Sequence, residues 1–195
     1  MTADSRTDPL RRSPLAHLPG TRTPGARLRE VPFLRQLDLR VRPGLATARV
    51  ADALGAALPS EPNTVVVCGE QRVLWLGPDE WLLVGPDGGA PHAERRLRAA
   101  LHGEVASLVD VSAHRTTLDL AGPAARTVLE KGCALDLHPR AFAPGRCAQT
   151  LVSKVNVIID QLDPEPHYRL LVRNSYAQYL ADWLLDAMAD PTLSP

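Results

Sequence analysis

The stretch that decides the fold runs from Val109 to Leu151 and reads VDVSAHRTTLDLAGPAARTVLEKGCALDLHPRAFAPGRCAQTL. Its first third predicts two short strands joined by a turn. Gly122 and Pro123 then stand where an N-cap and a first helical residue are expected, and Gly132 stands where a helix ends. The remainder is an irregular segment of mixed polarity that leads into another strand. The whole stretch predicts a strand pair, a helix and a long connection, with no catalytic constellation in it.

The rest of the chain repeats this plan. Apolar residues alternate with charged ones from Leu37 to Val41, which is the period of a half-buried strand. Ser175 is expected to cap the last helix, with Gln178 completing a capping box. The predicted strands cover residues 37–41, 64–68, 72–76, 81–84, 107–112, 115–121, 147–153, 155–160 and 167–173, and the predicted helices cover residues 45–58, 91–101, 123–131 and 176–188.

The order strand, helix, three strands, helix therefore occurs twice, although the residues themselves do not repeat. This order predicts an α+β fold with mostly antiparallel sheets covered by helices. We expect one domain over residues 30–190, made of two sequential halves at about 30–104 and 105–190, followed by a tail at 191–195.

Residues 1–29 differ from the rest because they hold four prolines, six arginines and few large apolar side chains. Such a segment buries too little apolar surface to offset the entropy lost on ordering. Leu15 and Leu18 are its only apolar pair with the spacing of an anchor. We expect an extended arm that orders on a partner subunit through these two leucines, or else a loose tail.

Composition excludes several classes of protein. Twenty-two basic residues balance twenty-two acidic ones, so net charge favours neither nucleic acid nor a membrane surface. No apolar run approaches the roughly 20 residues that span a bilayer. The three cysteines are widely spaced, and an odd, low count indicates the reducing cytoplasm.

Asp110, Ser112 and His114 suggest a hydrolase triad, but the sequence argues against one. Triad members come from separate elements, and the serine lies on an exposed elbow, whereas here all three fall at one turn. We expect Asp110 and Ser112 to hold that turn through side-chain bonds to the backbone.

Other residue types with chemical potential give no site. Cys133 and Cys147 have the positions of small core residues. The six histidines lack the spacing of metal ligands. The segment from Gly85 to Gly89 lacks the Gly-x-Gly-x-x-Gly order of a dinucleotide turn. We therefore expect no catalytic, cofactor-binding or metal-binding residue in this chain.

The connection from Ala134 to Arg146 is long for a compact domain and too apolar for disorder. Apolar anchors ringed by Arg and His are typical of a subunit interface, the alternative being a packed surface loop. Phe142 is the expected anchor, so its truncation should loosen a complex and leave the thermal midpoint of the free chain nearly unchanged. The predicted interface residues are Leu15, Leu18, Leu135, Leu137, His138, Arg140, Phe142 and Arg146.

The quoted stretch, the segment LWLGPDEWLLV at 74–84 and the ending from Ser175 to Trp183 together resemble the gamma subunits of heterotetrameric sarcosine oxidases. The resemblance covers about residues 30–188 and, more loosely, residues 13–18. It implies a fold similar to the folate-binding domain of the glycine-cleavage T-protein.

The resemblance also implies a function. In that family the complex is a flavoenzyme of sarcosine catabolism that oxidises sarcosine to glycine, with formation of hydrogen peroxide and methylenetetrahydrofolate. This chain is then an accessory subunit, with alpha, beta and delta subunits as partners. FAD, FMN, NAD, zinc and tetrahydrofolate would lie on those other subunits. The alternative is a self-standing folate-binding or aminomethyltransferase-like protein, for which Asp110 and Asp119 are the candidate pterin-facing carboxylates.

Overall fold

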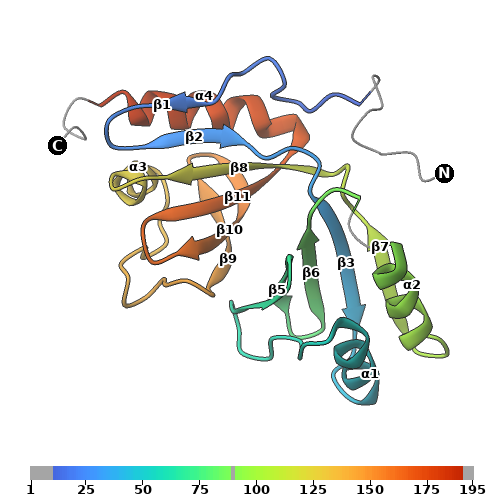
Figure 1. Cartoon of the computed structure of the whole chain (residues 1–195). Coiled ribbons are helices and arrows are strands. Elements are labelled where there is room, and N and C mark those ends of the chain that lie inside the picture. The colour runs from blue at the N-terminus through green and yellow to red at the C-terminus, as the bar shows by residue number, and fades with distance from the viewer. Residues whose placement is uncertain (1–10, 89–90, 191–195) are drawn as a thin grey trace. The chain divides into compact units, whose positions relative to one another are not determined.

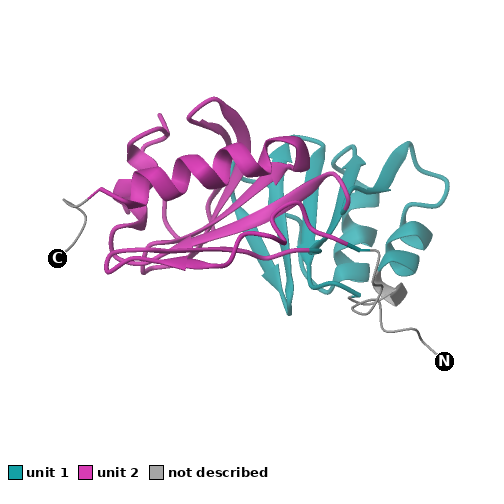
Figure 2. Ribbon diagram, turned by 90° about the horizontal axis from the view of Figure 1, so that it is seen from above, with its two compact units in different colours: residues 1–11, 33–112 teal, residues 12–32, 113–195 magenta. Residues whose placement is uncertain are grey.

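The computed structural model describes residues 11–88 and 91–190, and for residues 91–93 it describes the backbone alone. Residues 1–10 of the expected arm and the expected tail at 191–195 lie outside this range. The chain divides into two compact units, coloured separately in Figure 2. Among the described residues, unit 1 holds Arg11, 33–88 and 91–112, and unit 2 holds 12–32 and 113–190.

Unit 1 is a five-stranded antiparallel sheet in the order β4-β5-β6-β3-β7. The strands are β3 (Arg35–Val41), β4 (Val65–Cys68), β5 (Gln71–Gly77), β6 (Glu80–Gly85) and β7 (Ala106–Asp110), and the helices are α1 (Leu45–Leu54) and α2 (Pro91–Ala100). The two helices contact each other beside the sheet (Figure 1).

The core of unit 1 lies between these helices and alternate residues of the strands. Leu39 and Val50 are fully buried within it, and Trp81 donates its indole N–H to the carbonyl of Pro59 at 2.8 Å. The helix α1 ends earlier than the sequence predicts, because Gly55 adopts the left-handed conformation that stops a helix.

Unit 2 is a six-stranded antiparallel sheet in the order β1-β2-β8-β11-β10-β9. The strands are β1 (Thr21–Arg22), β2 (Arg27–Glu30), β8 (Arg115–Ala121), β9 (Cys147–Val152), β10 (Val155–Asp163) and β11 (His167–Arg173). The helices are α3 (Ala125–Glu130) and α4 (Ala177–Met188), with a 3₁₀ turn η2 (Asn174–Tyr176) before α4.

The helices of unit 2 pack on one face of its sheet. Leu28, Leu120 and Tyr168 lie in register on neighbouring strands and are buried in one core with Leu129 and Leu184. Successive strand residues point to opposite faces. The residues that precede and follow Leu28, Leu120 and Tyr168 in the sequence therefore point away from the helices. These residues belong to the candidate functional site.

The predicted repeat is present as topology. Unit 1 contains strand, helix, three strands, helix (β3-α1-β4-β5-β6-α2), and unit 2 contains the same series (β8-α3-β9-β10-β11-α4). The sheet of unit 1 gains one strand from outside its series, β7, and the sheet of unit 2 gains two, β1 and β2. β7 pairs with β3, and β2 pairs with β8, with the same place in each sheet.

These additional strands change the predicted boundaries. The strand before each series joins the sheet of the other series, since β2 precedes β3 but belongs to unit 2, and β7 precedes β8 but belongs to unit 1. The chain is therefore not divided into sequential halves at 30–104 and 105–190. Hydrophobic periodicity shows that a segment is a strand, but it does not show which partner the strand takes.

The N-terminal segment also differs from the sequence expectation. Residues 12–29 are not an arm apart from the domain, because Leu15 is 1% exposed in the core of unit 2 and Leu18 packs against that core. The pairing of Thr21 with Leu28 makes a hairpin, and Arg29 pairs with Asp119. The low apolar content was misleading because the few large apolar residues of this segment all contact the core, Leu15 and Leu28 as buried residues and Leu18 at its edge.

Two helix ends differ in detail from the sequence prediction. Ser175 does not cap α4, which begins after the 3₁₀ turn and has Tyr176 at its N-cap with no side-chain bond. The short helix α3 begins two residues later than predicted, with Ala124 at its N-cap. Gly132 follows the end of α3 for a reason of packing, since a Cβ there would lie 2.4 Å from Trp183.

Candidate functional site

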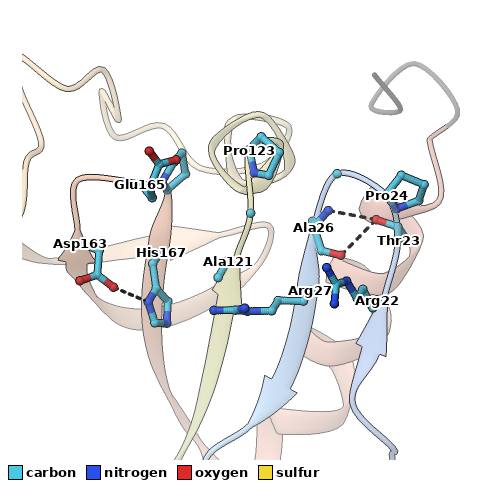
Figure 3. Close-up of a pocket in the computed structure, with 13 residues that line it drawn as sticks. Arg22, Thr23, Pro24, Ala26, Arg27, Ala121, Pro123, Asp163, Glu165 and His167 are labelled. Carbon is cyan, nitrogen blue, oxygen red and sulfur yellow. Dashed lines mark hydrogen bonds and ion pairs between the residues drawn. The ribbon is translucent and has the colours of Figure 1, made fainter.

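Three turns of unit 2 meet at one end of its sheet and enclose a pocket of about 300 Å³ (Figure 3). They are the β1–β2 turn, the turn from β8 into α3, and the β10–β11 turn. Their lining residues are Arg22, Thr23, Pro24, Gly25, Ala26, Arg27, Ala121, Gly122, Pro123, Asp163, Glu165, Pro166 and His167.

Gly122 holds the three turns together. Its N–H donates to the carbonyl of Pro166 at 3.0 Å, and the N–H of Ala124 donates to the carbonyl of Gly25 at 2.8 Å. Its φ is +122°, and a Cβ at this position would lie 2.7 Å from the oxygen of Gly25. The close approach of the β1–β2 turn therefore requires glycine here.

The β1–β2 turn is itself fixed. The hydroxyl of Thr23 donates to the carbonyl of Ala26 and accepts from its N–H, both at 3.2 Å, and the N–H of Thr23 donates to the same carbonyl at 2.8 Å. Pro24 restricts the turn further. The side chains that this turn carries are thus held on a rigid support.

Arg22 and Arg27 flank this turn as a directly opposed cross-strand pair. Arg27 reaches across Ala121 toward His167, and the guanidinium of Arg22 lies toward β2 (Figure 3). Across residues 11–88 and 91–190, no acceptor lies within hydrogen-bond or ion-pair distance of either guanidinium. On the other side of the pocket, Nδ1 of His167 lies 2.8 Å from a carboxylate oxygen of Asp163.

A row of alternating charges follows next along the same face of the sheet. Arg29, Asp119, Arg169 and Asp160 are successive cross-strand partners on β2, β8, β11 and β10. Asp119 is 3% exposed, accepts from Nε of Arg169 at 3.0 Å and lies 3.4 Å from Arg29. This carboxylate is engaged inside its own sheet, so it does not face a pterin as the folate-binding alternative requires.

Asp110 holds its turn, as predicted, whereas the Ser112 side chain bonds to Gln36 of β3 and not to its own turn. The Asp110 carboxylate accepts the N–H of Ser112 at 2.9 Å, and the Ser112 hydroxyl accepts the N–H of Gln36 at 2.9 Å. Burial acts to raise the pKa of Asp110, but the bonds from Ser112 and the charges of Arg35 and Arg98 outweigh it and lower that pKa. His114 lies in the other unit, where burial, Arg115 and Arg173 lower its pKa.

Asp110 and Ser112 also line a second pocket, of about 240 Å³, in unit 1. Arg11 lines it too, with a guanidinium nitrogen 2.6 Å from a carboxylate oxygen of Asp87 and with Cζ 4.2 Å from the ring centre of Phe33. Its guanidinium is thus already paired and stacked.

The cysteines and histidines occupy ordinary core and surface positions and form no metal or redox cluster among the described residues. Cys133 and Cys147 are buried free thiols, and Cys68 is a partly buried one. Within the described part of the chain, no three His, Cys, Asp or Glu side chains group as metal ligands. No helix among these residues is long and apolar enough to cross a membrane.

The connection from 134 to 146 has two kinds of residue, which the sequence did not separate. Leu137 is 1% and Phe142 4% exposed in the core of unit 2, and Leu135 packs against that core. These anchors thus serve the chain's own fold, together with Leu15 and Leu18. His138 and Arg140 are exposed and Arg146 is partly exposed.

The pocket of unit 2 is the feature that sequence reasoning missed. Its signal was present in part, because Arg22 and Arg27 flank the sequence Thr-Pro-Gly-Ala, which predicts a turn and hence a hairpin. The low apolar content of residues 1–29 concealed that hairpin.

Known proteins match this chain over nearly its whole length. The model of the family described as "Sarcosine oxidase, gamma subunit family" matches residues 40–190. The sarcosine oxidase subunit gamma of an Arthrobacter species is 40% identical over 95% of both chains. That of Corynebacterium sp. strain U-96 is 41% identical, covering 93% of this chain and 91% of the relative. This chain belongs to the sarcosine oxidase gamma subunit family.

Solved structures agree with this membership. A chain of the heterotetrameric sarcosine oxidase from Corynebacterium sp. U-96, in complex with pyrrole 2-carboxylate, superposes with a TM-score of 0.86 at 38% identity. The match covers 95% of this chain and 97% of that one. The gamma-subunit resemblance read from the sequence is confirmed.

The predicted likeness to the T-protein fold is confirmed as well. The glycine cleavage system aminomethyltransferase T from Bartonella henselae superposes with a TM-score of 0.61 at 16% identity. The match covers 87% of this chain and 46% of that one. At this identity the likeness extends to the fold alone.

Proposed function

We propose that this chain is the accessory gamma subunit of a heterotetrameric sarcosine oxidase, with alpha, beta and delta subunits as its partners. The complex would oxidise sarcosine to glycine, with hydrogen peroxide and methylenetetrahydrofolate as further products. FAD, FMN, NAD, zinc and tetrahydrofolate would be held by the other subunits, in the cytoplasm. The free thiols of all three cysteines fit a reducing compartment.

One observation carries this proposal. The chain matches gamma subunits over about 95% of both lengths, and its fold superposes on a chain of the heterotetramer with a TM-score of 0.86. Arg29, Arg169 and His167 surround the carboxylate of Asp119. Because this carboxylate is already paired, it argues against the self-standing folate-binding alternative.

The proposed subunit contact on the 134–146 connection is narrower than the sequence suggested. Leu15, Leu137 and Phe142 are core residues, so we propose that only the exposed and partly exposed side chains meet a partner. These are His138, Arg140, Arg146 and, at the edge of the core, Leu135 and Leu18. Arginine and apolar groups are favoured at such contacts.

Co-expression tests the assignment. A tagged version of this chain, expressed with the alpha, beta and delta subunits from the same source, should recover a yellow complex that forms peroxide when sarcosine is added. The tagged chain expressed alone should be colourless and inactive. Recovery of the other three subunits as an active complex that leaves this chain behind would contradict the proposal.

A further inference from the structure

We propose that the pocket of unit 2 binds a carboxylate group, held by the guanidinium groups of Arg22 and Arg27. Neither the family assignment nor the likeness to the heterotetramer assigns a ligand to this pocket. The carboxylate could belong to a small free acid or to an acidic side chain of a neighbouring subunit. Both sources share the same chemistry, and the experiment below separates them.

The first argument is the placement of the two arginines. They are direct cross-strand partners, and like charges in such positions repel and destabilise a strand pair. Neither has an acceptor within the described residues that would offset this repulsion. An anion between them removes the repulsion and satisfies both groups.

The second argument is the chemistry of the pair. Guanidinium presents its N–H donors in a planar fork that fits the two oxygens of a carboxylate, and such charge-assisted bonds are roughly twice as strong as neutral ones. Two forks from adjacent strands can thus grip one carboxylate from two directions. From residue 12 to residue 29 the segment has four arginines and no acidic residue.

The third argument is rigidity. The bonds of Thr23 to Ala26 lock the turn between the two arginines, and the approach of Gly122 to Gly25 fixes that turn against β8. A support of this kind lowers the entropy that a ligand site loses on binding. The pocket volume of about 300 Å³ leaves room for a carboxylate and several further atoms.

The acidic residues of the pocket do not cancel the pair. Asp163 is bonded to His167, and Glu165 is exposed on the β10–β11 turn. Asp163 and Glu165 belong to the end of β10 and the β10–β11 turn, whereas Arg22 and Arg27 belong to the β1–β2 hairpin (Figure 3). Arg27 reaches across Ala121 toward His167, and the nearest carboxylate on that side, Asp163, is already bonded to His167.

Titration of the isolated full-length chain with sodium acetate tests the site. Acetate carries the carboxylate of either source, so its binding does not depend on assembly with other subunits. The side-chain Nε–Hε signals of Arg22 and Arg27 in a ¹⁵N-correlated spectrum should shift saturably, with a dissociation constant on the order of millimolar. Sodium chloride at equal ionic strength should not reproduce the shift, and the signal of the exposed Arg12 should not move.

Variants make the result specific. Arg22→Gln with Arg27→Gln, followed like the parent through the backbone amide signals of Thr23 and Ala26, should weaken acetate binding by about tenfold or more, the loss expected for a charge-assisted hydrogen bond. The thermal midpoint should stay the same or rise, because a like-charge pair is removed. The matched variant Arg12→Gln should bind acetate as the parent does. Absence of a saturable shift at Arg22 and Arg27, or equal binding by the double variant, overturns the proposal.

Once acetate binding is established, the assembly of the variants with the other subunits identifies the source of the carboxylate. If the double variant assembles less tightly than Arg12→Gln with the other subunits, the natural ligand is an acidic side chain of a partner. If both assemble equally, the ligand is a small free acid. Failure of every form to assemble would contradict the proposed function and leave the acetate result standing.

Discussion

At the scale of single residues, packing requires glycine at two positions, because a side chain there would collide with its neighbours. Gly122 has a φ of +122° and lies against the backbone of Gly25, whereas Gly132 has no unusual φ and lies under the ring of Trp183. The sequence rule for a glycine after a helix would attribute Gly132 to a left-handed C′ residue. The structure instead attributes it to the contact between the end of α3 and α4.

Gly132→Ala should therefore destabilise the chain by about 1–3 kcal/mol, the usual cost of overpacking a core. A Cβ there would lie 2.4 Å from Trp183, closer than any relaxed contact. Urea unfolding would measure the loss. Gly20→Ala is the matched control, because a Cβ at Gly20 meets its nearest atoms at an ordinary 3.6 Å. Equal stability of the two variants would contradict the packing argument.

Asp110 gives a prediction that depends on pH. Its pKa in the folded chain lies below the ordinary value of 3.8, so its charged form contributes stability above that value. The contribution is lost as the pH falls through the lower pKa of the folded state. Asp110→Asn keeps the acceptor for Ser112 but removes the charge.

The free energy of unfolding of Asp110→Asn should therefore fall below that of the parent at pH 6 and approach it as the pH drops below 3.8. Urea unfolding across this range measures both. Asp52→Asn, a change at an acid of α1 for which no hydrogen bond or ion pair is found among the described residues, serves as the control. A difference between Asp110→Asn and the parent that is constant with pH would contradict the electrostatic cause.

At the scale of elements, the sequence predicted nearly every strand and helix of residues 35–188. Alternation from Leu37 to Val41 and the Asp-Pro-Glu-Pro turn before His167 both correspond to the observed elements. The failures lie where burial depends on distant partners. The hairpin of β1 and β2 has one strand of two residues, which is too short for any periodicity, and Leu28 is buried only because β2 pairs with β8.

Contacts between residues far apart in the sequence also explain which parts of the candidate site could be predicted and which could not. The bond between Asp110 and Ser112 joins residues two positions apart, so local sequence predicted it, whereas the bond of the Ser112 hydroxyl to Gln36 spans 76 positions. The turn sequence after Arg22 predicts the hairpin alone, whereas the pocket also needs His167, about 140 positions further along the chain. Exposed and buried residues of the 134–146 connection were likewise indistinguishable, because Leu137 and Phe142 meet a core built from other elements.

The structure reverses the effect that the sequence predicted for Phe142→Ala on the thermal midpoint of the free chain. Since Phe142 is 4% exposed in the core, truncation should cost about 3–5 kcal/mol and lower the thermal midpoint of the free chain clearly. Arg140→Ala, on the same connection and exposed, should leave that midpoint nearly unchanged. Differential scanning calorimetry of the two variants decides the matter, and similar midpoints would place Phe142 outside the core.

At the scale of the whole molecule, each repeat is completed by a strand that precedes the other repeat. β8 of unit 2 pairs on one side with β2 and on the other with β11, so its sheet includes residues from both ends of the described chain. Leu15 and Leu28 then enter the core of unit 2 from the N-terminal side, where they are 1% and 2% exposed. The C-terminal repeat is thus incomplete without residues 12–32.

A fragment of residues 113–190 should consequently fail to fold by itself. Loss of Leu15 and Leu28 alone would cost about 2–5 kcal/mol each, which approaches the entire stability of a typical domain. Removal of β2 would also leave the hydrogen-bonding edge of β8 open. A synthetic peptide of residues 12–32 should restore a dispersed amide spectrum and a cooperative thermal transition to this fragment. The same peptide with Leu15→Ala and Leu28→Ala, which keeps its charge and its turn, should not. A dispersed spectrum from residues 113–190 without any peptide would show that the C-terminal repeat is complete in itself and that β2 adds nothing essential.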